Sequence, residues 1–431
     1  MGIKKIMKKN AINVYSEIGK LKKVLVHRPG DELKYVTPQR MDELLMSAII
    51  ELEQAKEEHD AFTKILRDNG VEVIELADLT AEMYDSLTPS EKDAFLNQWV
   101  KEASWGKKSS IDALKIKKNL SKKVFDYVKS IKPTRKMIDK LMAGVLLSEI
   151  GEKSIILNKD KKNEMVIDLV VDPMPNLYFT RDPFASVGNG ITLHNMKYPT
   201  RKRETIFAQW IFNKHPEYKD VPQFISKRDG KETIEGGDVF IYTKDVLAIG
   251  VSERTNMEAI LRIATNIKKD KNCEFKKIVA INVPPMGNLM HLDTWLTMLD
   301  KDLFLYSGNI KSALKVWEID LTKPITPKSP KLSTAKLADI LAKIVGKKVR
   351  MIPIGGKDGN QMDIDIETHF DGTNYLAIAP GVVVGYHRNR KTQKALEEAG
   401  VKVLAFQGNQ LSLGMGSARC MSMPLVREEV K

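Results

Sequence analysis

Apolar and polar positions follow two different periods at the start of the chain. The apolar run Val24-Leu25-Val26, closed by Arg28-Pro29-Gly30, predicts a strand. From about Met41 to Asn69, apolar residues recur at helical spacing, which predicts one long amphipathic helix that stops at Asn69-Gly70. The alternating segment Val71–Leu76 predicts a second strand. The chain therefore begins with a β-α-β unit.

The pattern changes between about Thr80 and Ile150, where we predict no strand. Thr88-Pro89-Ser90-Glu91 is typical of a helix start, and Pro133-Thr134 is typical of a break between helices. Residues 80–151 are therefore predicted to form an all-helical insertion into a larger domain made of residues 1–79 and 152–431. A polar, lysine-rich loop is predicted at Asn158–Glu164.

From Val166 onward, β-rich segments dominate and one arrangement recurs. Val239–Thr255 and Tyr375–Thr392 each predict two strands, a glycine near the end of the second strand, an arginine-containing loop and a helix. A third copy is predicted over Asn176–Glu204. The spacing between copies varies, which excludes a regular solenoid. Repeated ββα units around a common centre would bring several strand ends to one mouth, so a site there would collect residues from distant parts of the chain.

Composition is that of a soluble globular protein, with 42% hydrophobic and 29% charged residues. No apolar run reaches the length of a membrane span, and the lysine-rich stretch Met1–Asn10 has no apolar segment behind it. We therefore predict a cytoplasmic protein. The two cysteines exclude a disulfide framework and a cysteine-rich zinc site. Of these, Cys273 is predicted to be a small buried apolar residue.

The formal net charge of +13 comes from scattered lysines. No recognition-helix pattern accompanies them, and no aromatic residues are interleaved with them, so we predict solvated lysine faces and no nucleic-acid or membrane partner. The spacings of histidine and cysteine that hold metals are absent, and so is a Walker-type phosphate loop. No metal and no cofactor are predicted.

Two segments carry residues suited to nucleophilic chemistry and proton transfer. Leu413–Pro424 places Cys420 behind two alternate glycines and beside Arg419, a cation that favours the thiolate needed for attack. If Met290–Thr294 is a strand, His291 and Asp293 point to the same face. Histidine is the usual proton carrier near neutral pH. Each segment alone also fits a structural role, as a buried cysteine or a hydrogen-bonded pair.

Two further segments place acids beside strands. In Ile234–Val239, Glu235 and Asp238 bracket two glycines directly before a strand. In Pro175–Pro183, an apolar strand is predicted to end at Asp182, which the following proline holds extended. A hairpin and a capped turn are the structural alternatives. The four segments together, without metal spacing, predict a cysteine hydrolase that acts on a cationic substrate.

The segments TIEGGDVF, MHLDTWLTMLD, NLYFTRDPFASVGNG and GMGSARCMSMPL resemble the arginine deiminases of the guanidino-group modifying superfamily, the penteins, and most of all the mycoplasma type. The resemblance extends from about Asn13 to Pro424. It implies an α/β fold: a five-bladed propeller of ββαβ-like units with an all-helical insertion. It also implies a cofactor-free hydrolase of linear amidines that converts free L-arginine to L-citrulline and ammonia, and a homo-oligomer, dimeric or larger.

The resemblance also implies roles for individual residues. Cys420 would be the nucleophile, His291 the general acid and base, Glu235 the carboxylate that orients His291, and Asp182 and Asp293 the clamp on the guanidinium. Asn176, Phe179, Arg201 and Arg254 would hold the amino-acid end, Gly414 would offer its carbonyl to the ammonium, and Leu45 would belong to a mobile lid. Met415 stands where some family members have an arginine that contacts the substrate carboxylate, and Arg419 is expected to substitute for it in part.

Four other functions fit parts of the pattern. An amidinotransferase and a dimethylarginine hydrolase need the same residue types, but the helical insertion and Arg181-Asp182-Pro183 argue against both. A basic module that binds polyanions would show binding that falls steeply with salt. A papain-like protease is disfavoured because here the cysteine follows almost all of the chain.

Overall fold

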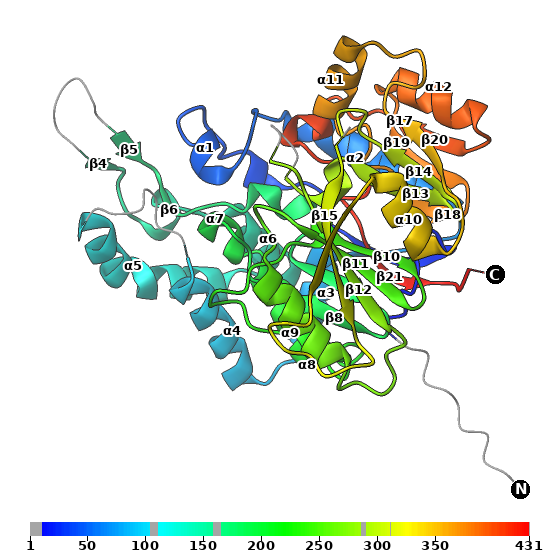
Figure 1. The fold of residues 1–431 in the computed structure, drawn as a ribbon. Helices are drawn as coiled ribbons and strands as arrows, with labels where there is room; N and C mark the ends of the chain where they lie inside the picture. Colours follow the sequence, from blue (N-terminus) through cyan, green and yellow to red (C-terminus); the bar gives the residue numbers. More distant parts are fainter. Residues whose placement is uncertain (1–10, 104–110, 158–164, 286–289, 311, 431) are drawn as a thin grey trace, which may run out of the picture.

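The structure, a computed structural model, describes residues 11–103, 111–157, 165–285, 290–310 and 312–430 (Figure 1). The lysine-rich stretch Met1–Asn10 and the loop predicted at Asn158–Glu164 lie outside this range. None of the described helices is long and apolar enough to cross a membrane.

One strand order recurs in five sheets of the described chain. In four of them an antiparallel hairpin is followed by a helix and by a strand that pairs in parallel with the second hairpin strand. The first of these four sheets contains β7 (Phe184–Val187), β8 (Gly190–Leu193) and β9 (Gln223–Ile225), and the second contains β10 (Val239–Thr243), β11 (Val246–Val251) and β12 (Lys277–Asn282). The third contains β13 (Leu296–Asp300), β14 (Leu303–Tyr306) and β17 (Arg350–Pro353). The fourth contains β18 (Leu376–Ala379), β19 (Val382–Tyr386) and β20 (Lys402–Phe406). The connecting helices include α7 (Pro199–Lys202), α8 (Thr205–Lys214), α9 (Met257–Ile267), α10 (Leu337–Val345) and α12 (Arg390–Glu398), while α11 (Gln361–His369) lies between β17 and β18.

The fifth sheet joins the two ends of the described chain. Strand β1 (Leu21–Val26) pairs in parallel with β2 (Glu72–Glu75), with Val24 opposite Val73, and antiparallel with β21 (Met423–Arg427), with Leu25 opposite Met423. Strand β1 therefore has one antiparallel and one parallel neighbour, like the middle strand of the other four sheets. Its antiparallel neighbour, β21, comes from the other end of the described chain. Two further antiparallel strands, β15 (Leu314–Asp320) and β16 (Lys331–Ala335), extend the β10-β11-β12 sheet beyond β12.

The predicted β-α-β start is confirmed, but the helix predicted from Met41 to Asn69 is wrong. The chain instead forms α1 (Met41–Leu44), breaks, and resumes as α2 (Leu52–Asp68). Leu45 has the left-handed conformation, with φ of 55°. The carboxylate of Glu51 then caps the new helix by accepting hydrogen bonds from the N–H groups of Glu53 and Gln54. Helical spacing alone did not indicate this break.

The strand-and-helix copies predicted at Val239–Thr255 and Tyr375–Thr392 are confirmed by β10-β11-α9 and β18-β19-α12. The third copy is confirmed only after Pro183. The strand predicted to end at Asp182 is wrong, because Pro175–Tyr178 forms a 3-10 turn and β7 begins at Phe184. Proline at the first position of the turn suits a helical start and not a central strand.

Helices α3 (Leu76–Asp85), α4 (Pro89–Lys101), α5 (Ile111–Ser130) and α6 (Thr134–Ala143) fill most of the segment predicted to be helical. Thr88 and Glu91 form a capping box at the start of α4, as their sequence indicates. The prediction of no strand before Ile150 is wrong in one detail: β3 (Val145–Leu146) pairs with β6 (Leu169–Val171), next to the hairpin β4 (Ile155–Leu157) and β5 (Met165–Ile167).

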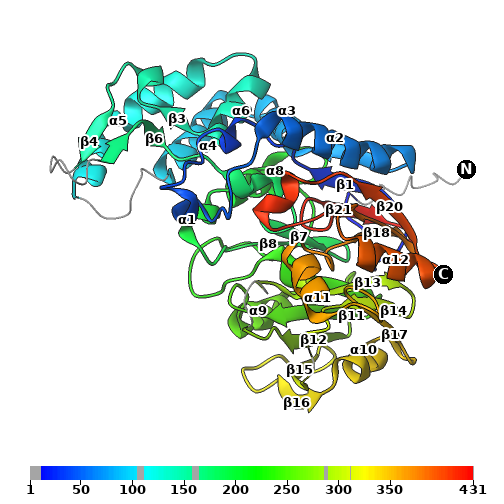
Figure 2. The same cartoon turned by 90° about the horizontal axis from the view of Figure 1, so that it is seen from above.

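The helical segment lies to one side of the molecule, far from β15 and β16 (Figure 2). Its buried residues nevertheless belong to the same apolar core as the neighbouring sheets: Phe95 and Trp99 of α4 share one cluster with Leu25 of β1 and Ile249 of β11. A second cluster contains residues of the sheets that include β10, β13 and β18. A third packs around Cys420 and β1.

Candidate active site

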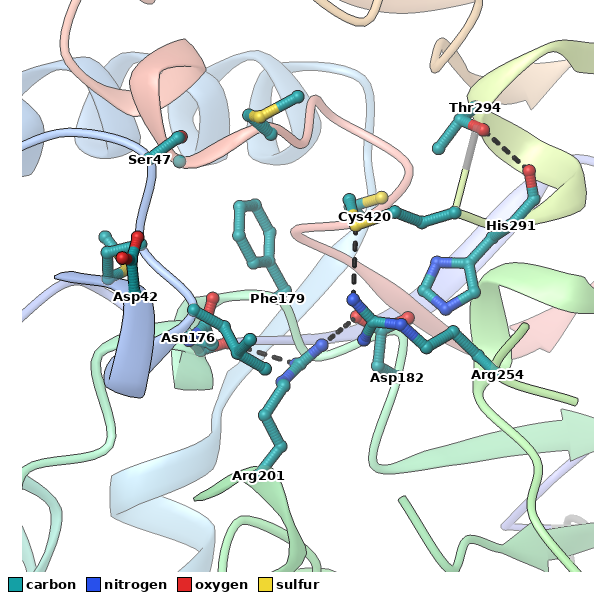
Figure 3. Close-up of a pocket in the computed structure, with 15 residues that line it drawn as sticks. Asp42, Ser47, Asn176, Phe179, Asp182, Arg201, Arg254, His291, Thr294 and Cys420 are labelled. Carbon is teal, nitrogen blue, oxygen red and sulfur yellow. Dashed lines mark hydrogen bonds and ion pairs between the residues drawn. The ribbon is translucent and has the colours of Figure 1, made fainter. Parts of the chain in front are cut away.

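A pocket of about 290 Å³ gathers residues from distant parts of the chain (Figure 3). It is lined by Asp42, Leu45, Met46, Ser47, Asn176, Phe179, Asp182, Arg201, Arg254, Met290, His291, Thr294, Gly414, Met415 and Cys420. Nine of the eleven residues predicted for the site are among these. The other two, Glu235 and Asp293, are buried behind the pocket wall, where Glu235 contacts His291 and Asp293 contacts Cys420.

The nucleophile loop, Gly414–Cys420, packs directly on two aromatic rings. A Cβ atom on Gly414 would lie 1.7 Å from the hydroxyl oxygen of Tyr178, and one on Gly416 would lie 2.3 Å from the ring of Phe179. The two alternate glycines are therefore needed for close approach to these rings. This packing leaves Cys420 with 5% of its surface exposed, at the pocket wall.

The surroundings of the Cys420 thiol favour its neutral form. Burial and the carboxylates of Asp293, Asp182 and Asp371 raise its pKa well above that of an ordinary thiol, while Arg419 lowers it. The Sγ atom lies 3.5 Å from Oδ2 of Asp293. Arg419 thus acts in the predicted direction but is outweighed, so the thiolate needs another positive charge in the pocket.

His291 lies beside the pocket on a turn. The predicted strand Met290–Thr294 is wrong: residues Leu292–Thr294 form a 3-10 turn, and β13 begins only at Leu296. Two hydrogen bonds explain the turn, since the N–H of Leu292 donates to Asp238 Oδ1 at 2.9 Å and the Thr294 hydroxyl donates to the His291 carbonyl at 2.6 Å.

The imidazole of His291 is protonated at neutral pH. Its Nε2 atom lies 2.9 Å from Oε2 of Glu235, which is fully buried. Burial lowers the pKa of His291, but Asp182, Glu235 and Asp238 outweigh burial and raise it to about 9. Burial likewise raises the pKa of Glu235, but His291 and Arg254 bring it below its usual range. The pair is therefore an imidazolium against a carboxylate.

Both aspartates predicted to clamp a guanidinium already hold one. Oδ2 of Asp182 lies 2.8 Å from Nη1 of Arg201, and Oδ2 of Asp293 lies 2.8 Å from Nη1 of Arg419. Arg201 also pairs with Glu204, at 2.9 Å. Oδ1 of Asp293 is buried and has no hydrogen-bond partner among the described residues. The two carboxylates thus have the shape and charge for guanidinium binding, and Oδ1 of Asp293 keeps unused hydrogen-bonding capacity.

The arginines predicted for the amino-acid end differ in position. Arg201 and Arg254 line the pocket, and both reach toward Asp182 (Figure 3). Arg254 pairs with Glu235 at 3.1 Å and stacks over Tyr198. Arg419 does not line the pocket: its guanidinium is buried against Asp293 and the Val239 carbonyl. The expectation that Arg419 substitutes for an arginine at Met415 is therefore wrong, because this cation is enclosed in the core.

The residues after the break in the first helix form one edge of the pocket. Leu45 lines it, and the Asn176 side-chain amide donates to the Leu44 carbonyl at 2.7 Å. The Ser47 hydroxyl donates to the Leu413 carbonyl at 2.6 Å, directly before the nucleophile loop. This edge is thus hydrogen-bonded both to the Asn176 side chain and to the residue directly before the nucleophile loop.

Several supporting residues were missed by sequence reasoning. Asp42, Met46, Ser47 and Thr294 line the pocket without any motif that singled them out. Cys273 is half-buried at the edge of the first core cluster, less enclosed than predicted. Among the described residues, no group of three or more histidine, cysteine or acidic side chains could hold a metal ion.

Comparison with known proteins gives one family. A family model described as arginine deiminase matches residues 42–427. The chain is 51% identical to an arginine deiminase of Metamycoplasma arthritidis, covering 97% of this chain and 98% of that protein. It is 50% identical to an arginine deiminase of Metamycoplasma hominis, covering 98% of each.

Two solved structures share the fold at low sequence identity. An amidinotransferase of Microseira wollei from saxitoxin biosynthesis aligns with a TM-score of 0.54 at 15% identity, over 97% of this chain and 98% of that chain. The N-terminal domain of ArgZ aligns with a TM-score of 0.50 at 13% identity, over 94% and 98%. The chain therefore shares the mixed α/β fold of these two structures.

Proposed function

The chain belongs to the arginine deiminase family, and we propose that its pocket hydrolyses free L-arginine to L-citrulline and ammonia. One observation carries the proposal: a buried cysteine lies beside two aspartates that each bind a guanidinium group, across from a histidine paired with a glutamate.

The substrate guanidinium binds between Asp182 and Asp293. A guanidinium is planar and stays protonated, and its donors match carboxylate oxygens, so two carboxylates fix its plane. The unpartnered Oδ1 of Asp293 supports this placement. Arg201 gives up part of its contact with Asp182 to the substrate and remains held by Glu204.

The bound cation supplies the positive charge that the thiol lacks. It offsets the carboxylates that raise the pKa of Cys420, and the thiol proton passes to water, because His291 is already protonated. The thiolate attacks the central guanidinium carbon and forms a carbon–sulfur bond. His291 donates a proton to the departing nitrogen, the carbon–nitrogen bond breaks, and ammonia leaves a covalent thiouronium on Cys420.

Water completes the reaction at the same carbon. His291, now neutral, takes a proton from water, the resulting hydroxide attacks the thiouronium carbon, and the carbon–sulfur bond breaks to release citrulline. The buried Glu235 favours the protonated form of His291 in the first half and holds the ring for the second. Both halves use one proton carrier in opposite directions.

The other end of the pocket selects a free amino acid. Arg201 and Arg254 attract the α-carboxylate, Gly414 offers its carbonyl to the α-ammonium, and Asn176, Phe179 and Leu45 enclose the chain between them. Agmatine, which lacks the carboxylate, cannot form these additional ion pairs with Arg201 and Arg254 and is expected to be a poor substrate.

Four broader proposals accompany the activity. The recurring strand order supports a five-bladed propeller of ββαβ-like units. We divide the chain into a catalytic domain, residues 1–79 and 152–431, and a helical insertion, residues 80–151. A cytoplasmic location and a homo-oligomeric state follow from the family and stay predictions.

A colorimetric assay for the ureido group tests the function, with L-arginine as substrate and no metal or cofactor added. Wild-type protein is expected to form citrulline and Cys420→Ala none. An added amine acceptor separates the neighbouring activity, since an amidinotransferase would convert it to a new guanidino compound. No citrulline from folded wild-type protein would exclude the proposal.

A further inference from the structure

Asn374, fully buried before β18, contacts both segments that meet at the nucleophile. Its side-chain oxygen accepts hydrogen bonds from the N–H groups of Ser417 at 3.3 Å and Cys420 at 3.0 Å. Its side-chain nitrogen donates to the backbone carbonyl of Asp293 at 3.2 Å. Its own carbonyl accepts from the N–H of Arg419 at 3.3 Å. One residue therefore joins the nucleophile loop to the turn that carries Asp293.

The opposite side of the loop is held by Arg181. The N–H of Arg181 donates to the Cys420 carbonyl at 3.0 Å, and its Nε donates to the Arg419 carbonyl at 3.1 Å. Asn374 is thus the part of this clamp that also reaches Asp293. The 3.5 Å contact between Sγ of Cys420 and Oδ2 of Asp293 depends on two backbone segments that Asn374 holds together.

We propose that Asn374 is a positioning residue, which fixes the sulfur of Cys420 relative to the guanidinium held by Asp293. The inference rests on the proposed function. A misplacement of about 1 Å in the reacting groups costs about a hundredfold in rate. The amino-acid end depends on Asn176 and Arg201, whose contacts lie on Leu44, Asp182 and Glu204, so substrate binding is expected to survive the loss of Asn374.

Asn374→Ala is compared with Asn389→Ala, a matched control. Asn389 is buried like Asn374 and lies outside the pocket. Its side chain donates one hydrogen bond to the Phe370 carbonyl at 3.1 Å. Asn374→Ala is expected to lower kcat about a hundredfold with KM within about twofold. Asn389→Ala removes one buried hydrogen bond, so it should lower the melting temperature and leave kcat unchanged. Equal kcat values in the two variants would overturn the inference.

Asn374→Asp adds a readout that a purely structural role does not move. A protonated aspartic acid can accept from Cys420 and donate to the Asp293 carbonyl as asparagine does, whereas an ionised one repels that carbonyl and adds charge beside the thiol. Asp293, Asp371, Arg419 and Cys420 are the titratable or charged groups on the segments around it. The kcat of the variant relative to wild type is therefore expected to fall as pH rises. A ratio independent of pH would contradict the inference.

Alkylation by iodoacetamide separates this inference from the proposed function. Without Asn374 the loop opens more readily, so Cys420 in Asn374→Ala should react about tenfold faster than in wild type or Asn389→Ala. If wild-type protein forms no citrulline, the proposed function fails, and the alkylation rates still test the positioning. If citrulline forms and the three alkylation rates agree, the positioning fails alone.

Discussion

At the scale of single residues, Gly237 supports the catalytic ring. A Cβ atom there would lie 2.6 Å from Nδ1 of His291 and 2.9 Å from Oδ1 of Asp293, closer than such atoms approach. Gly237→Ala is therefore expected to push the imidazole away from the pocket and to lower kcat about a hundredfold, measured as citrulline formed under saturating arginine.

Gly308→Ala is the matched control for that substitution. A Cβ atom at Gly308 would meet its nearest neighbour at 3.5 Å, an ordinary contact. Its kcat is expected to equal that of wild type. A Gly237→Ala variant with wild-type kcat would show that His291 can move without loss of function.

From the charges around Cys420, we expect one substitution to speed up alkylation of the thiol and to slow the turnover of arginine. Asp293 raises the pKa of the thiol and Arg419 lowers it, so Asp293→Asn is expected to lower this pKa. At a fixed pH below the pKa, each unit of that shift gives about tenfold more thiolate, and alkylation by iodoacetamide speeds up accordingly. Turnover falls, because one side of the guanidinium clamp is lost. The measurement is the alkylation rate from pH 6 to 10 beside kcat/KM; slower alkylation in the variant would contradict the charge assignment.

Residue types and short motifs were enough to predict several of the residues that gather at the pocket. Cys420, His291 and Asp182 line the pocket as predicted, because each stands in a distinctive segment. Arg419 was misjudged because sequence proximity to Cys420 says nothing of which way a side chain points. Asn374 could not be predicted, since its role comes from hydrogen bonds to residues far along the chain.

At the scale of elements, the break between α1 and α2 provides one edge of the pocket, and Ser47 fastens that edge to the Leu413 carbonyl at 2.6 Å. Ser47→Ala removes a hydrogen bond worth about 1 kcal/mol, so KM for arginine is expected to rise about fivefold, with little change in kcat. Steady-state kinetics on arginine check this. Ser130→Ala, which removes a similar hydroxyl bond at 2.7 Å in α5, is the control. Equal KM values in the two variants would mean that arginine binding does not depend on the hydrogen bond between Ser47 and Leu413.

Helical spacing over Met41–Asn69 concealed this break. Apolar residues on both sides keep the period, the left-handed turn at Leu45 leaves no mark in that period, and the new helix is capped by Glu51, which is not one of the usual N-cap residue types. The strand predicted at His291 failed for a similar reason, because Asp238 and Thr294 supply the hydrogen bonds of a turn. By contrast, the capping box at Thr88 is local, and it was predicted correctly.

At the scale of the whole molecule, the helical segment and the sheets share one apolar core. Phe95 of α4 is fully buried in the cluster that includes Leu25 and Ile249. Phe95→Ala removes about 3–5 kcal/mol of stability. Because the core is continuous, the temperature at which activity is lost should fall together with the loss of helical circular dichroism. Helix loss well below the temperature of inactivation would show instead that the helical segment unfolds by itself.

The recurrence of ββα units was visible in the sequence for three copies, since hairpin and glycine signals lie close together along the chain. The unit around β1 was not visible, because its antiparallel neighbour β21 lies at the opposite end of the described chain. Pairings between such distant segments leave no local signal.

This pairing of β1 with β21 has a consequence for biosynthesis. On the ribosome, β1 emerges early and β21 after every other strand, so one edge of the first sheet stays open while all the intervening chain is made. An open strand edge is a template for wrong partners. Cys420 is translated only three residues before β21, so a stalled chain lacks both the nucleophile and the closing strand. Incomplete products are thus inert toward arginine and exposed to aggregation, which favours their early removal by the cell's quality-control proteases.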